Sequence, residues 1–293
     1  MNYDIKQISI EDENYPESLK KISDAPKTLY YRGDFFKENE ICFAVVGTRN
    51  PTDYGKRVAM QIVGELVDAG LTIISGMAPG IDTLAHKVCV EKGKRTIAVL
   101  GTGLDEKSIY PQENLGLAKK IIETGGCLIS ELSPGSPGLK FNFPKRNRIV
   151  SGLSLGVLIV EAKEKSGSLI TANYAKKQGK KVFAVPGQIF TSNAKGTNRL
   201  IKEGAILTES AEDVLKNLEI ESLVQKSLEI NKFQTAENET EKLILFAISE
   251  EPLYIDKIIQ ATKLSPPVVA TTLALMEISG KIRTLGGGVY SLN

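Results

Sequence analysis

Short apolar runs alternate with longer amphipathic segments through the middle of the chain. The runs lack in-and-out alternation, which is typical of strands buried on both faces of a parallel sheet. Between the first two runs, Val58, Ile62 and Leu66 recur at helical spacing, and Gly70 is placed to end that helix. The alternation therefore predicts a doubly wound α/β domain. Its predicted strands are Ile41–Val46, Leu71–Ile74, Thr96–Leu100, Cys127–Ile129, Val157–Val160 and Lys181–Val185.

The two ends of the chain follow different patterns. The first 38 residues are polar and mixed, and their prolines interrupt any long helix, so only a short helix near Ser18–Ile22 is expected. The last 54 residues contain three segments with helical periodicity and a hairpin around Gly286-Gly287-Gly288, which predict a winged helix. We expect four parts, namely a lead-in segment (1–38), an α/β domain (39–218), a polar linker (219–239) and a winged-helix domain (240–293).

Length, composition and charge limit the class of protein that this outline can describe. With 293 residues, the chain is longer than a usual single core, and its 42% hydrophobic and 25% charged residues are typical of a globular protein. The formal net charge is only +2, so any binding of a polyanion depends on where cations cluster. The 3 cysteines lie in apolar contexts, and neither a leader-like start nor a membrane-length apolar run is present, so we expect a cytoplasmic protein without a membrane partner.

Loops rich in small residues follow the predicted strands. In an open parallel sheet the carboxyl ends of the strands form one rim, where ligands bind. Gly47-Thr48-Arg49 follows the first strand, and Arg49 offers a forked donor suited to a phosphate or a guanine edge. Another loop combines Ser166, Gly167, Ser168 and Thr171. A helix cap needs only one such hydroxyl, so this loop favours an anion-holding role.

Several common chemistries are not indicated. Gly101-x-Gly103 lacks the third glycine of a dinucleotide fingerprint, and no Gly-Lys pair is followed by Ser or Thr as in a phosphate-binding P-loop. The single histidine, His86, has no ligand cluster or catalytic partner at a recognisable spacing. We therefore expect no catalytic residues, no metal and no cofactor.

One basic segment stands out against this background. Residues 140–148 combine four cations with two aromatic rings, and no acidic residue occurs from Leu132 to Val160. Cations hold phosphates and rings stack on bases, so this is a candidate nucleic-acid site, although a solvated helix start with two core phenylalanines is the alternative. A second acid-free stretch favours a longer cationic track; it contains Lys176, Lys177, Lys180, Lys181, Lys195, Arg199 and Lys202.

Several ordered motifs together closely resemble the bacterial DNA-processing protein A family, also called DprA or Smf. The resemblance covers nearly the whole chain. It is carried by Tyr15-Pro16, Val46-Gly47-Thr48-Arg49, the run from Ile74 to His86, Tyr110-Pro111, the run from Phe143 to Ile149 and the run from Gly167 to Ala172.

The resemblance implies an extended Rossmann-like domain that binds single-stranded DNA, dimerises and helps to load the recombinase RecA during natural transformation. It implies a pocket in which Arg49 meets a phosphate or base, while Lys140 or Lys145 contacts phosphate and Phe143 stacks on a base. At least one of the three residues that follow Lys145 should reach the strand. The expected DNA-binding set is Gly47, Thr48, Arg49, Lys140, Phe143, Lys145, Arg146, Asn147, Arg148, Gly167, Ser168 and Thr171.

Two alternatives remain open at this point. One is an enzyme of the phosphoribohydrolase type, in which Glu161 would supply the carboxylate. The other is a transcription regulator whose rim senses a ligand while the small domain reads DNA. The predicted third helix of the small domain, Pro266 to Ser279, contains no Lys or Arg, so we favour a partner-binding or regulatory role over base reading for that domain.

Overall fold

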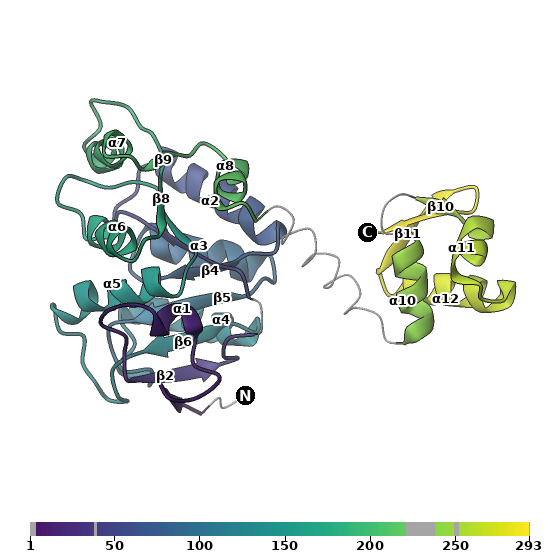
Figure 1. The fold of residues 1–293 in the computed structure, drawn as a ribbon, viewed down its shortest axis with the longest axis horizontal. Coiled ribbons are helices and arrows are strands. Elements are labelled where there is room, and N and C mark those ends of the chain that lie inside the picture. The colour runs from purple at the N-terminus through teal and green to yellow at the C-terminus, as the bar shows by residue number, and fades with distance from the viewer. Residues whose placement is uncertain (1–3, 38–39, 221–237, 249–251, 293) are drawn as a thin grey trace. The chain divides into compact units, whose positions relative to one another are not determined.

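The computed structural model describes residues 4–37, 40–220, 238–248 and 252–292. The chain divides into two compact units, Met1–Ile220 and Glu221–Asn293 (Figure 1). Most of the predicted linker, residues 219–239, lies outside the described residues. Among the described residues, no helix combines the length and apolar character needed to cross a membrane.

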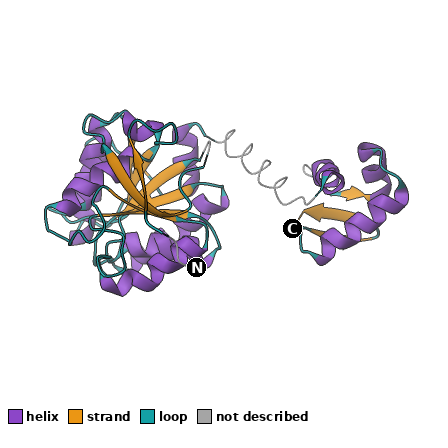
Figure 2. Ribbon diagram, turned by 90° about the horizontal axis from the view of Figure 1, so that it is seen from below, coloured by secondary structure: helices purple, strands orange, loops and turns teal. Residues whose placement is uncertain are grey.

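The larger unit is built around one nine-stranded sheet in the order β1-β2-β6-β5-β4-β3-β7-β8-β9. Figure 2 shows these strands at the centre of the unit with helices around them. The strands are β1 (Lys6–Ser9), β2 (Thr28–Gly33), β3 (Cys42–Val46), β4 (Thr72–Ser75), β5 (Thr96–Leu100), β6 (Cys127–Ser130), β7 (Gly156–Ile159), β8 (Lys181–Ala184) and β9 (Ile206–Leu207).

The predicted doubly wound sheet is confirmed. The six strands from β3 to β8 occur where the apolar runs predicted them, and they pair with one another in parallel. Every residue of β3 to β7 is buried, which explains why these runs lack alternation. The chain winds from β3 towards β6 and then, from β7, in the opposite direction. The switch point therefore lies between β3 and β7, whose register pairs Ala44 with Val157.

Helices cover both faces of this sheet. Side chains from α1, α5, α6 and α7 pack on one face in a single hydrophobic cluster, and α2, α3 and α4 contact the strands from the other. The helices are α1 (Glu17–Lys20), α2 (Asp53–Asp68), α3 (Ile81–Glu91), α4 (Leu115–Glu123), α5 (Asn142–Gly152), α6 (Ser168–Lys177), α7 (Lys195–Lys202) and α8 (Ala211–Leu218), with short 3-10 helices η1 (Gln112–Asn114) and η2 (Ser192–Ala194).

The segment before residue 38 contains two strands that the sequence pattern did not predict. β2 pairs antiparallel with β6, and β1 pairs with β2, so together they extend one edge of the sheet. The helix expected near Ser18–Ile22 is present as α1, and its Leu19 is fully buried in the same cluster as α5. The Tyr15 hydroxyl donates to Pro26 O at 2.6 Å. These contacts make the segment part of the larger unit's core.

The smaller unit has the three helices and hairpin of a winged helix. Its helices are α10 (Glu239–Ala247), α11 (Ile255–Thr262) and α12 (Pro266–Ile278), and its sheet joins β10 (Leu253–Tyr254), β12 (Val289–Leu292) and β11 (Ile282–Gly286) in that order. Ile244, Ile258, Val269, Leu273 and Met276 are buried at its centre. β10 is too short for the sequence pattern to have predicted it.

Candidate nucleic-acid interface

A cavity of about 680 Å³ opens where the chain reverses its winding direction. It is formed by the loops that follow β3, β4, β5, β6 and β7, together with the start of α5. We call it the Arg49 cavity. Ten of the twelve predicted site residues line it, namely Gly47, Thr48, Arg49, Lys140, Phe143, Arg146, Asn147, Gly167, Ser168 and Thr171. These ten residues come from three separate segments, up to 124 positions apart between Gly47 and Thr171, and therefore share one site.

The loop that carries Arg49 is fixed by its backbone. Thr48 N donates to Glu161 O at 2.8 Å, and Ile81 N donates to Thr48 O at 3.2 Å. Gly80, at φ +85°, packs so closely that a Cβ there would lie 2.3 Å from Thr48 O and 2.6 Å from Arg49 O. This close approach holds the backbone of Arg49 in place, while the side chain of Arg49 is exposed.

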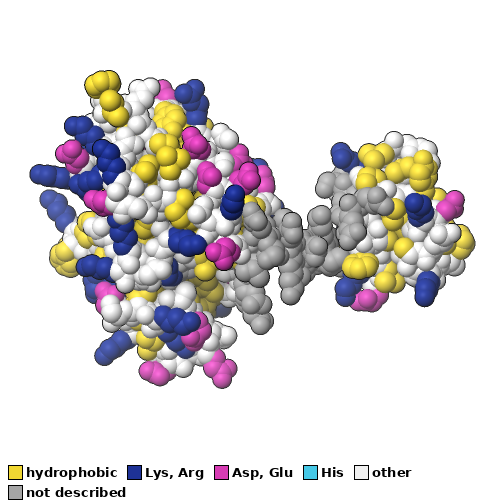
Figure 3. Space-filling view, turned by 45° about the horizontal axis from the view of Figure 1, so that its top comes forward, with side chains coloured by type: hydrophobic (Ala, Val, Ile, Leu, Met, Phe, Trp, Pro, Cys, Tyr) yellow, Lys and Arg dark blue, Asp and Glu magenta, His cyan; other side chains and the backbone are white. Residues whose placement is uncertain are grey.

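Four exposed cations line the cavity. They are Arg49, Lys140, Lys163 and Lys165, and none forms an ion pair with a residue that the structure describes. Cations without local carboxylate partners are available to phosphates. Lys163 and Lys165 were not predicted, because Glu164 between them gave the segment a mixed charge. Figure 3 shows Lys and Arg side chains gathered along the left side of the larger unit, the side on which Figure 1 places α5, α6 and α7.

Arg146 has a different environment from these four. Its guanidinium is buried, and its Nη1 donates to Gly76 O at 2.6 Å and also to Val99 O. Burial lowers the pKa of Arg146 to about 10, with Asp82 acting in the opposite direction and Arg49 in the same direction. Arg146 is therefore charged at neutral pH, and it ties α5 to the ends of β4 and β5 from the wall of the cavity.

A buried carboxyl lies beside that guanidinium. Asp82 Oδ2 accepts from Gly76 N at 3.1 Å, and burial raises the pKa of Asp82 to about 6, although Arg146 acts to lower it. One turn further along α3, His86 is buried with its Nδ1 2.8 Å from Thr96 Oγ1. Burial lowers the pKa of His86 to about 3, so this imidazole is neutral at physiological pH.

Two aromatic rings form one wall of the Arg49 cavity. The ring centroids of Tyr110 and Phe143 are 5.4 Å apart. Phe143 packs against Gly101, where a Cβ would lie 2.9 Å from its Cδ1, so the ring is firmly seated. Tyr110 is 49% exposed. Exposed ring faces beside cations suit the stacking of bases. The sequence predicts Phe143 as a residue that stacks on a base, whereas it indicates Tyr110 only as part of the Tyr110-Pro111 motif.

Lys145 and Arg148, the other two predicted site residues, do not line the cavity. Lys145 Nζ lies 3.4 Å from Glu131. Arg148 is 2% exposed and forms ion pairs with Glu131 at 2.6 Å and with Asp24 at 2.8 Å. These pairs connect α5 to the lead-in segment and to the end of β6. The second basic stretch contributes no residue to the cavity either; Lys180, for example, donates to Gly152 O and Ser154 O.

The serine-rich loop before α6 completes the site. Ser166 and Ser168 hydroxyls lie 2.8 Å apart, and Asn147 Nδ2 donates to Gly167 O at 3.3 Å. These contacts join the loop to α5, so that its small polar groups line the cavity together with the cations. Glu161, the carboxylate considered for an enzyme, does not line this cavity.

The chain resembles known proteins along most of its length. The family model described as DNA recombination-mediator protein A matches residues 6–219, and the model described as DprA winged helix domain matches residues 234–288. Protein Smf of Escherichia coli (strain K12) is 38% identical over 289 residues, which cover 97% of this chain and 77% of that protein. DNA processing protein DprA of Bacillus subtilis (strain 168) is 45% identical over 217 residues, which cover 73% of this chain and 71% of that protein.

Solved structures agree with these relatives. DNA processing protein A from Streptococcus pneumoniae superimposes with a TM-score of 0.68 and 42% identity, covering 72% of this chain and 74% of that chain. DNA processing protein A from Helicobacter pylori, whose structure describes a single-stranded DNA binding mode, gives a TM-score of 0.63 and 32% identity, covering 73% of this chain and 95% of that chain.

Proposed function

The chain belongs to the DNA recombination-mediator protein A family, and from that premise we propose that it binds single-stranded DNA in the Arg49 cavity. The observation that carries the proposal is the meeting of four exposed cations, none paired with a carboxylate in the described part of the chain, with the Tyr110 and Phe143 rings in one cavity. Cations that follow a phosphate backbone beside rings that stack on bases are the usual means of holding a single strand without reading its sequence. The single-stranded DNA binding mode of the Helicobacter pylori relative supports the same function.

The residues of the cavity take different parts in this proposal. Arg49 and Lys140, joined by Lys163 and Lys165, contact phosphates because their charges are exposed. Phe143 and Tyr110 stack on bases. Gly47, Thr48, Gly167, Ser168, Thr171 and Asn147 offer small polar groups and backbone amides to the strand. Arg146 adds positive charge from the wall, while Lys145 and Arg148 position α5 through Glu131.

We propose that the chain captures single-stranded DNA without chemistry, as a homodimer, and helps to load RecA onto it during natural transformation. No catalytic step is assigned to the cavity. Glu161 is engaged by Thr52, whose N and Oγ1 donate to it at 2.9 and 2.5 Å, so we do not propose the enzyme alternative. Loading is tested by adding the chain to RecA and single-stranded DNA coated with single-strand-binding protein. RecA-dependent ATP hydrolysis should start sooner with the wild type than with Arg49→Ala.

Fluorescence anisotropy tests the binding step, using labelled oligothymidine and its duplex counterpart across a salt series. We expect preference for the single strand and an affinity that falls as salt rises, by roughly 0.7 logarithmic units per logarithmic unit of salt for each phosphate neutralised. Arg49→Ala removes a charge-assisted contact worth about 1.5–3 kcal/mol, so affinity should fall by roughly ten- to a hundredfold.

The matched control is Lys120→Ala. Lys120 is an exposed cation in the last turn of α4, the helix that leads into β6, so it lies towards the amino ends of the strands and away from the cavity at their carboxyl ends. The Lys120→Ala substitution should reduce affinity for the strand little, and both Lys120→Ala and Arg49→Ala should unfold at the same urea concentration as the wild type. Equal affinity of Arg49→Ala and wild type, with normal stability, would place the binding site elsewhere.

A further inference from the structure

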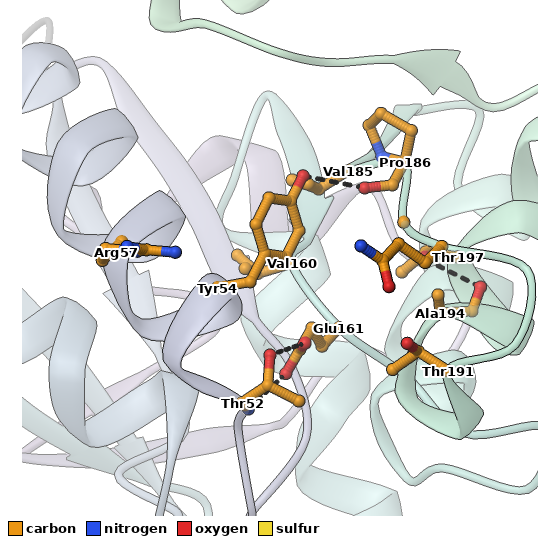
Figure 4. Close-up of a pocket in the computed structure, with 12 residues that line it drawn as sticks. Thr52, Tyr54, Arg57, Val160, Glu161, Val185, Pro186, Thr191, Ala194 and Thr197 are labelled. Carbon is orange, nitrogen blue, oxygen red and sulfur yellow. Dashed lines mark hydrogen bonds between the residues drawn. The ribbon is translucent and has the colours of Figure 1, made fainter.

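A second cavity, of about 420 Å³, adjoins the first on the same rim of the sheet. It is formed by the start of α2, the residues just after β7 and the loop between β8 and α7. Figure 4 shows the Tyr54 ring between Arg57 on one side and Ala194 and Thr197 on the other. We call this cavity the Tyr54 pocket.

The walls of the Tyr54 pocket are held by hydrogen bonds within the protein. The Tyr54 hydroxyl donates to Pro186 O at 2.9 Å, which fixes the ring across the opening between α2 and the β8–α7 loop (Figure 4). The Thr197 hydroxyl donates to Ala194 O at 3.1 Å. At the base of the pocket, Glu161 accepts from Thr52 and from Asn193 Nδ2. The pocket is therefore preformed.

The chemistry of the pocket suits a nucleotide. Val160, Val185 and Ala194 supply an apolar floor, and Tyr54, which is 43% exposed, offers a ring face. Arg57 is exposed and forms no ion pair with a described residue. The carboxylate of Glu161 at the bottom of the pocket disfavours a phosphate deep inside. A nucleobase would therefore enter the pocket, while the phosphate of that nucleotide would remain at the rim near Arg57.

The loop at the pocket's rim carries two large apolar side chains in solvent. Phe190 is 93% exposed and Ile189 is 73% exposed, and their neighbours Gln188 and Thr191 both line the pocket. An apolar ring held in water beside a cavity has no stabilising role in the fold. It is well placed to stack on a base.

The two cavities share two segments of backbone. Along the loop after β3, Arg49 and Asn50 line the Arg49 cavity and Thr52 lines the Tyr54 pocket. Along the loop after β7, Glu161 lines the Tyr54 pocket and Lys163 lines the Arg49 cavity. Two or three residues span at most about 10 Å of chain in each case. A ligand that is a polymer can therefore reach from one cavity to the other.

We propose that a single strand held in the Arg49 cavity continues into the Tyr54 pocket, which binds a further nucleotide of the same strand. The base packs against Tyr54 and the apolar floor, the phosphate meets Arg57, and Phe190 stacks on an adjacent base. This inference rests on the proposed function, since it requires that the ligand of the Arg49 cavity is a single-stranded nucleic acid.

The test compares oligothymidines of about 4, 8 and 16 nucleotides on the full-length wild type, Arg57→Ala and Phe190→Ala. Both residues are exposed, so neither substitution should disturb the fold. We expect each to weaken binding of the longest strand by roughly five- to thirtyfold and of the shortest by less than about twofold. Lys120→Ala is the control for loss of a charge. A 16-nucleotide strand carrying photoreactive 5-iodouracil should also crosslink to the peptide that contains Tyr54.

The possible outcomes separate the two proposals. If Arg49→Ala weakens every length but Arg57→Ala and Phe190→Ala bind all lengths as the wild type does, the Tyr54 pocket is no part of the strand's path and the inference is wrong. If the wild type binds no oligonucleotide, the proposed function fails, and the inference falls with it. Equal losses on short and long strands in Arg57→Ala would also overturn it, because they would place Arg57 at the first nucleotide.

Discussion

Neighbouring cations of the same motif have opposite environments in the folded chain. Lys140 is exposed at the Arg49 cavity, Arg146 is buried against backbone carbonyls, and Arg148 is enclosed by carboxylates. The sequence could predict that this motif and Arg49 lie on one rim, because both follow parallel strands. It could not separate the exposed cations from the buried ones, since that depends on which side of α5 faces the ends of β4 and β5.

The carboxyl of Asp82 makes the charge of the Arg49 cavity depend on pH. Burial raises its pKa to about 6 from an ordinary 3.8, so it is ionised at neutral pH and protonated in mild acid. Loss of that negative charge should strengthen the binding of oligothymidine between about pH 7.5 and about pH 5 by about 1 kcal/mol, or roughly fivefold. Anisotropy titrations at constant ionic strength measure this change.

Asp82→Asn is the control for that pH dependence. The amide stays neutral, so the variant should bind at both pH values about as tightly as the wild type does in acid. Tighter binding in acid is not offset by a loss of stability from this carboxyl. Its pKa in the folded chain, about 6, lies above the ordinary 3.8 of the unfolded chain. Its contribution to the free energy of unfolding is therefore full below pH 3.8 and is lost as pH rises through about 6. A pH dependence that persists in Asp82→Asn would assign the titration to another group.

The backbone conformation of Gly80 should control the position of Arg49. A residue with a Cβ is strained at φ +85° and ψ −127°, and the Cβ would also collide with Thr48 O and Arg49 O. Gly80→Ala should lower the free energy of unfolding by roughly 2–4 kcal/mol and weaken DNA binding, as urea denaturation and anisotropy would show. Gly93→Ala is a matched control, because Gly93 has φ +63° but no atom near a Cβ; its cost should be only about 1 kcal/mol.

At the scale of elements, burial decided which strands the sequence could predict. β3 to β8 are almost entirely buried and therefore read as unbroken apolar runs. β1 and β2 have one buried residue each, and β9 has two residues with none buried. Such strands carry no run of buried apolar residues, and the place of β2 in the sheet depends on its pairing with the distant strand β6.

The lead-in segment should be essential to the larger unit, since α1 seats α5. Leu19 is fully buried, and it packs so closely on α5 that a Cβ at Gly152 would lie 2.7 Å from its Cδ1. Leu19→Ala should lower the free energy of unfolding by about 2–5 kcal/mol in urea denaturation. Leu155→Ala, at a leucine that is 45% exposed, is the control and should cost less than about 1 kcal/mol. Equal costs would mean that α1 adds nothing to the core.

At the scale of the whole molecule, the chain combines two units that match separate family models. The smaller unit has the winged-helix fold that the sequence predicted, but its α12 carries no Lys or Arg. Two of the three cations that flank α12 already have partners, because Lys281 donates to Glu241 at 2.8 Å and Arg283 to Ser291 at 3.2 Å. This unit is poorly equipped to read a groove of duplex DNA.

Truncation after residue 238 should therefore leave the binding of single-stranded DNA nearly intact. Since the four exposed cations and both rings of the Arg49 cavity belong to the larger unit, the truncated chain should bind oligothymidine within about threefold of the full chain and with the same salt dependence. Anisotropy on both chains measures this, with circular dichroism to confirm that the shorter chain is folded. Loss of most of the affinity from a folded truncated chain would instead support a regulator, in which the small unit contacts DNA and the rim of the sheet senses another ligand.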